Sequence, residues 1–127
     1  MVIFTRMKKL RDFERRHLPY LRSIEDFDIV HEIGACQEQG LAMTPKRLVL
    51  ASIASPATVQ RRLSRLADLG VIRKRFSRHD GRIIELTVSG ETAAIYAQMA
   101  SLLRQVPGAT PRMKAAIAKP ERPAAIA

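Results

Sequence analysis

Residues 44–88 read TPKRLVLASIASPATVQRRLSRLADLGVIRKRFSRHDGRIIELTV and contain two helix starts that lie eleven residues apart. Thr44-Pro45 and Ser55-Pro56 each place a hydroxyl that can cap a helix before a proline at the first helical position. This spacing predicts a short helix over about 45–51, a tight turn, and a second helix over about 56–69. The arrangement is that of a helix-turn-helix, in which the first helix braces the second.

The second of these helices has one apolar and one polar face. Its apolar side chains recur at spacings of four, three and three, which predicts a buried stripe of Val59, Leu63, Leu66 and Leu69. At about 100° per residue, the opposite face is polar and carries two arginines. It comprises Ala57, Gln60, Arg61, Ser64, Arg65 and Asp68. A plain solvated surface is the alternative interpretation of this face.

The polar face suits the edges of base pairs in a DNA major groove. Glutamine can bond adenine through two hydrogen bonds, arginine can do so with guanine, and an alanine methyl can touch the methyl of thymine. We therefore expect base contacts from Ala57, Gln60, Arg61 and Ser64. Side chains nearer the flanks are expected to meet phosphates instead, and these are Thr58, Arg62 and Arg65.

A β-hairpin is predicted directly after this helix. Residues 71–77 and 83–88 both alternate in polarity, and Asp80-Gly81 between them is a strong turn signal. Such a hairpin is the wing of a winged helix-turn-helix. We expect Arg73 and Arg75 to contact phosphates, and the wing itself to act through Arg78, Asp80 and Arg82. The Asp80 carboxylate can hold the Arg82 guanidinium extended toward a minor groove; a surface ion pair of little stability is the alternative.

The charge distribution favours a polyanionic partner. The chain of 127 residues has a formal net charge of +10, and residues 44–82 hold ten basic and two acidic side chains. Residues 23–43 hold five acidic side chains and no lysine or arginine. A basic block of this kind attracts nucleic acid, although a soluble protein with a basic surface is the simpler alternative.

Helices are also predicted on both sides of this region. Residues 3–18 form a basic amphipathic pattern, and a further helix over about 90–105 carries an apolar face of Ile95, Met99, Leu102 and Val106. An exposed apolar face on a terminal helix favours a partner. The expected organisation is a dimerisation helix in 1–22, a DNA-binding domain in 23–92, a second dimerisation helix in 93–106 and a flexible tail in 107–127.

Other classes of function find no support in the sequence. Cys36 is the only cysteine, and His17, His31 and His79 are far apart, so we predict neither a disulfide nor a metal or other cofactor. We see no catalytic triad, carboxylate pair or phosphate-binding glycine loop, and therefore predict that the protein is not an enzyme. No apolar run approaches the length of a membrane span, so we expect no membrane association and a cytoplasmic, nucleoid-associated protein.

Taken together, these motifs resemble the MarR family of bacterial transcription regulators. The resemblance covers about 40% of the chain and rests on Thr44–Leu48, Ser55–Leu66, Leu69–Ile72, Asp80–Arg82 and Leu86–Gly90. It implies a homodimer that binds pseudo-palindromic operators. In some members of that family a small aromatic acid releases the DNA, so a small-molecule effector is a further implication. The chain departs from the family in its short length, its proline-rich end and the Ile53 that stands near the usual glycine of the turn.

By position, the resemblance implies that Ala57, Gln60 and Arg61 face bases. It also implies that Thr58 and Arg62 hold phosphates, and that Arg82, steered by Asp80, enters the minor groove.

We therefore predict a mainly α protein with a small two-stranded β wing (α+β), built as a winged helix-turn-helix with terminal dimerisation helices. The predicted function is sequence-specific binding of double-stranded DNA by a transcriptional regulator. Two alternatives stay open. One is a winged-helix factor of plasmid or phage replication or of nucleoid organisation, and the other is a winged helix that contacts proteins.

Overall fold

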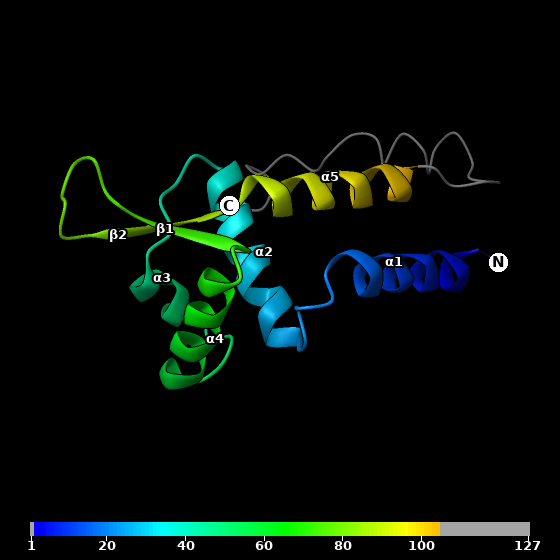
Figure 1. The fold of residues 1–127 in the computed structure, drawn as a ribbon, viewed down its shortest axis with the longest axis horizontal. Helices are drawn as coiled ribbons and strands as arrows, with labels where there is room; N and C mark the ends of the chain where they lie inside the picture. Colours follow the sequence, from blue (N-terminus) through cyan, green and yellow to red (C-terminus); the bar gives the residue numbers. More distant parts are fainter. Residues whose placement is uncertain (1, 105–127) are drawn as a thin grey trace. The chain divides into compact units, whose positions relative to one another are not determined.

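A computed structural model describes residues 2–104, which form five helices and one two-stranded antiparallel sheet (Figure 1). The elements are α1 (Ile3–His17), α2 (Ile24–Glu38), α3 (Pro45–Leu50), α4 (Pro56–Asp68), β1 (Ile72–Phe76), β2 (Ile84–Val88) and α5 (Gly90–Arg104). The predicted fold class, mainly α with a two-stranded wing, is confirmed. The predicted tail over 107–127 lies outside the described residues.

The chain divides into two compact units. One, here called the winged-helix unit, is Tyr20–Ala93 and holds α2, α3, α4 and the sheet. The other contains, among the described residues, those up to Pro19 and those from Ala94 to Arg104, and therefore holds α1 and most of α5. The boundary at Ala94 falls inside α5, so this helix belongs to both units.

Hydroxyl caps begin four of the described helices. The side chains of Ser23, Thr44, Ser55 and Ser89 accept hydrogen bonds from the backbone N–H groups three residues later, at 3.3, 3.2, 3.2 and 3.2 Å. The predicted helix starts after Thr44 and Ser55 are thereby confirmed. Each cap supplies an acceptor to an N–H group that has no partner within the helix.

The apolar core of the winged-helix unit gathers side chains from every one of its elements. It comprises Leu21, Ile29, Val30, Ile33, Cys36, Met43, Leu48, Val59, Leu63, Leu66, Val71, Ile72 and Leu86. The predicted stripe on α4 is confirmed at Val59, Leu63 and Leu66. Its fourth member, Leu69, was a wrong prediction: this side chain is 49% exposed, because α4 ends at Asp68 and Leu69 is the capping residue outside the stripe.

The hairpin is anchored to the core at its base. β1 and β2 pair in the register Ile72↔Val88 to Phe76↔Ile84, and Figure 1 shows them extending past α3 and α4. The N–H of Leu86 donates to the carbonyl of Met43 at 2.8 Å, which adds a single bridge on the far edge of β2. Since Leu86 is buried, this bridge fixes the segment before α3 to the sheet, a contact that the sequence did not indicate.

The turn between α3 and α4 contains Ser52 at a φ of +58°, a left-handed conformation that costs an L-residue about 1–2 kcal/mol. Replacing Ser52 by glycine is expected to raise the free energy of unfolding by about 0.5–1 kcal/mol. This value is the relief of backbone strain minus the entropic cost of ordering glycine, which is more flexible than serine in the unfolded chain. Urea denaturation measures this change. The matched control is Ala51→Gly, where φ is −70°, and it should lower stability instead. A loss of stability in Ser52→Gly would show that the left-handed conformation of Ser52 does not destabilise the folded protein.

Candidate nucleic-acid interface

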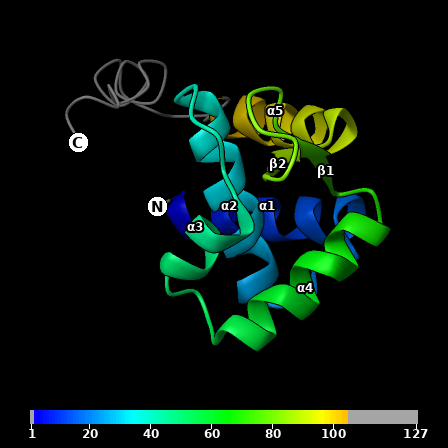
Figure 2. The same cartoon turned by 90° about the vertical axis from the view of Figure 1, so that its left-hand side faces the viewer.

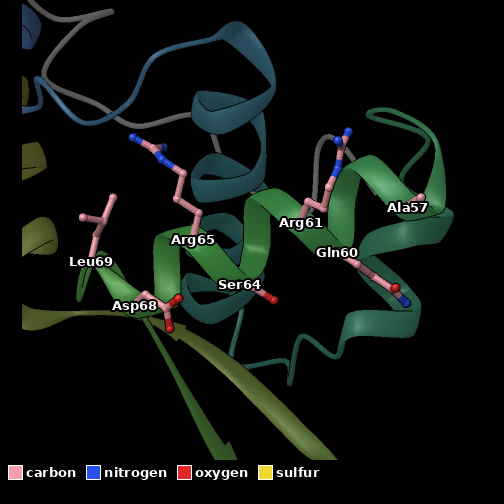
Figure 3. Close-up of a pocket in the computed structure, with 7 residues that line it drawn as sticks. All are labelled: Ala57, Gln60, Arg61, Ser64, Arg65, Asp68 and Leu69. Carbon is pink, nitrogen blue, oxygen red and sulfur yellow. The ribbon is translucent and has the colours of Figure 1, made fainter.

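The exposed face of α4 forms a shallow, open depression. It is lined by Ala57, Gln60, Arg61, Ser64, Arg65, Asp68 and Leu69. Figure 3 shows Arg61 and Arg65 leaving the helix along one edge, and Gln60, Ser64 and Asp68 leaving it along the other. All four side chains predicted for base contacts are therefore brought together on one accessible surface.

A chain of hydrogen bonds organises the start of this surface. The hydroxyl of Ser55 donates to the Thr58 hydroxyl at 2.9 Å, and a guanidinium nitrogen of Arg61 donates to the same oxygen at 3.2 Å. The Thr58 hydroxyl oxygen therefore accepts hydrogen bonds from two neighbouring side chains. The capping residue of α4 thus reaches Arg61 through Thr58.

Arg62 and Arg65 are placed differently from the expectation of phosphate contacts. Their guanidinium groups donate to the carboxylate of Asp26 on α2, at 3.3 and 3.4 Å, and each side chain is only 31% exposed. Arg65 also donates to the carbonyl of Tyr20 at 2.8 Å. Asp26 itself is fully buried and accepts a further hydrogen bond from the N–H of Arg22 at 3.0 Å. These contacts hold both guanidinium groups toward α2, although Arg65 also lines the depression on α4.

At the tip of the wing, the predicted pair of Asp80 and Arg82 is present. The Asp80 carboxylate accepts from the backbone N–H of Arg82 at 3.0 Å and from its guanidinium at 3.3 Å. The Arg82 side chain remains 92% exposed. An exposed pair of this kind contributes little to stability, so its effect is to restrict where the guanidinium extends.

The strands of the wing carry the remaining basic residues. Arg73, Lys74 and Arg78 are exposed, as is Arg75, whose guanidinium lies 4.0 Å from the carboxylate of Glu85 opposite it on β2. Figure 2 shows this hairpin above α4 in the winged-helix unit. The unit therefore presents a polar helix face together with a basic hairpin.

Comparison with known proteins identifies this architecture. A mutant MarR from E. coli complexed with operator DNA superposes with a TM-score of 0.52 at 20% identity, covering 80% of this chain and 71% of that one. The protein has the MarR-type winged-helix fold. A mutant MepR from S. aureus gives 0.57 at 13% identity over 98% and 84% of the chains, and BpsR from Bordetella bronchiseptica gives 0.51 at 19% over 92% and 85%. No family model and no curated protein matches the sequence.

Within the MarR-type fold, sequence reasoning missed the function of Asp26. The backbone N–H of Asp26 donates to the Ser23 hydroxyl that caps α2. The Asp26 side chain, however, pairs with arginines 36 and 39 residues later in the chain. An available signal was the acidic block before Thr44 and the basic block after it, because a buried carboxylate requires cationic partners.

Among residues 2–104, no group of three or more histidine, cysteine or acidic side chains is arranged to hold a metal ion. Cys36 is buried and its thiol donates to the carbonyl of Leu41 at 3.5 Å. None of the helices in the described part of the chain is long and apolar enough to cross a membrane.

In the other unit, burial and the nearby carboxylate of Glu14 raise the pKa of the Tyr96 phenol well above its usual range, so Tyr96 stays neutral.

Proposed function

We propose that this protein is a transcriptional regulator that binds double-stranded DNA sequence-specifically, with α4 in the major groove and the hairpin on the minor groove. The observation that carries the proposal is the face of α4. Its apolar stripe is buried, and the side chains that suit base edges are left together on the exposed side. The MarR structure complexed with operator DNA has the same fold and supports this placement.

In this proposal the site residues take three roles. Base edges are contacted by Ala57, Gln60, Arg61 and Ser64. Phosphates are contacted by Thr58, Arg73 and Arg75, and the wing acts through Arg78, Asp80 and Arg82. Arg62 and Arg65, which the sequence suggested for phosphates, are instead proposed to pair with buried Asp26, to which both donate.

The proposal includes a homodimer formed by the helices in 1–22 and 93–106. Support comes from α1, where Ile3, Phe4 and Met7 are 53, 80 and 52% exposed. Apolar side chains gathered on one helix favour a partner surface. A small-molecule effector is also proposed, because the DNA binding of BpsR, which shares the fold, is regulated by 6-hydroxynicotinic acid.

Selection of binding sites from a random duplex library with the full chain tests the function. A dimeric regulator should enrich a pseudo-palindromic motif whose half-sites lie about 10–10.5 base pairs apart or at a multiple of that spacing. A nucleoid-organising factor would retain DNA without enriching a motif, and a protein-interaction module would show no affinity for duplex DNA. Either of these results would overturn the proposal in favour of the corresponding alternative.

The wing strand supplies a prediction on salt dependence. Replacing Arg73 or Lys74 by alanine removes an exposed charge, so binding should weaken about equally for all duplex sequences. The slope of log affinity against log salt concentration should become shallower by about one unit. Fluorescence anisotropy at several salt concentrations measures this slope. Lys9→Ala on α1 is the control for loss of charge alone, and an equal change there would contradict a specific role of the wing.

A further inference from the structure

The carboxylate of Asp26 joins three segments of the winged-helix unit at one buried point. One oxygen accepts from Arg62, and the other accepts from Arg65 and from the backbone N–H of Arg22. Arg65 in addition holds the carbonyl of Tyr20. The start of α2, the middle of α4 and residues 20–22, through which the chain enters this unit, therefore share one hydrogen-bonded cluster.

Resting on the proposed function, we propose that Arg65, assisted by Arg62, is a positioning residue for DNA recognition. By holding Asp26 and Tyr20 it fixes the orientation of α4 relative to residues 20–22, and so determines where the base-contacting side chains lie. Arg65 itself does not contact DNA. Its effect on sequence preference passes through Arg61 and Ser64, which directly precede Arg62 and Arg65 in the sequence.

The helical geometry explains how such an effect is transmitted. Successive residues of a helix differ by about 100°, so Arg61 and Ser64 lie next to the edge that Arg62 and Arg65 occupy. A rotation or shift of this edge moves the exposed face by a similar amount, because α4 is a rigid element with a packed apolar stripe. Hydrogen bonds to base edges tolerate only small displacements.

Of the two arginines, Arg65 makes the stronger contacts within the cluster. Its guanidinium spans two partners on different segments, and the contact with the Tyr20 carbonyl at 2.8 Å is the shortest in the cluster. Arg62 makes one contact with Asp26, and its buried Nε has no hydrogen-bond partner among the described residues. A planar guanidinium can bridge a carboxylate and a carbonyl at once, whereas the single ammonium group of lysine cannot match that fork.

The test compares Arg65→Lys and Arg65→Gln with wild type in the full chain, using the duplex selected by wild type and a scrambled duplex. Lysine keeps the positive charge but cannot donate to Asp26 and Tyr20 at once as the guanidinium does. The ratio of affinities for the two duplexes should therefore fall by roughly 3- to 30-fold, the range of effects seen for residues that couple to a binding site through a contact network. In both variants the salt slope should stay that of wild type, because no phosphate contact is removed. Arg16→Lys on α1, an exposed arginine, is the matched control.

Three results would overturn the inference. An unchanged ratio in Arg65→Lys would show that charge alone matters at this position. A salt slope shallower by about one unit in Arg65→Gln would indicate a phosphate contact. A lower unfolding temperature with an unchanged ratio would show a merely structural role. If Arg65→Lys does not fold, as judged by circular dichroism, Arg62→Lys is measured against the same three criteria. Failure of wild type to select any duplex would instead overturn the proposed function.

Discussion

Replacing Asp26 by alanine is expected to lower the free energy of unfolding by about 2–4 kcal/mol. Loss of one member of a buried ion pair usually costs more than this. Here the two arginine side chains are each 31% exposed, so water can solvate part of the charge that is left behind. The remaining cost has two sources: the N–H of Arg22 loses its acceptor, and a fully buried side chain leaves a void.

Chemical denaturation of the full chain, followed by circular dichroism, measures the change at Asp26. The matched control is Asp28→Ala, because Asp28 lies on the same helix and is exposed. That variant should stay within about 0.5 kcal/mol of wild type. A loss at Asp26 no larger than the loss at Asp28 would mean that the cluster does not hold α4 to α2. Asp26→Asn adds a graded comparison, since an amide can still accept from Arg22 but carries no charge.

The helix starts and the wing were predictable because local chemistry determines them. The hydroxyl–proline pairs at Thr44 and Ser55, and the Asp80-Gly81 turn, act over three or four residues and leave a clear mark in the sequence. The buried stripe on α4 was predictable for the same reason, up to the helix end. Leu69 fits the period of the stripe but follows the last helical residue, and ends of helices are poorly specified by periodicity.

The parts that could not be predicted depend on contacts between distant residues. Arg65 fits the polar face of α4 equally well as a phosphate contact or as a partner of Asp26, and the choice depends on how α2 packs against α4. The bridge from Met43 to Leu86 likewise joins residues that share no local pattern. Helical spacing assigns a residue to a face, but it does not give the direction in which a long arginine side chain extends from the edge of that face.

Replacing Arg61 by alanine is expected to reduce the preference for the selected operator over other sequences by about 1–3 kcal/mol, which is roughly 5- to 150-fold. Arg61 is exposed on α4, and Thr58 restrains its guanidinium through a hydrogen bond of 3.2 Å. A restrained side chain loses less conformational entropy when it binds a guanine edge. Competition between operator and scrambled duplexes in an anisotropy assay measures the preference directly.

Two further variants separate base recognition from non-specific DNA binding. Thr58→Val removes both the restraint on Arg61 and the proposed phosphate contact of Thr58. It should therefore weaken binding to both duplexes and lower operator preference by a smaller amount than Arg61→Ala does. Arg73→Ala should weaken both duplexes alike and leave the preference intact, since Arg73 is proposed to contact phosphates. If Arg61→Ala behaved like Arg73→Ala, Arg61 would be a phosphate contact. The specificity of α4 would then rest on Gln60 and Ser64, which lie along its other edge (Figure 3).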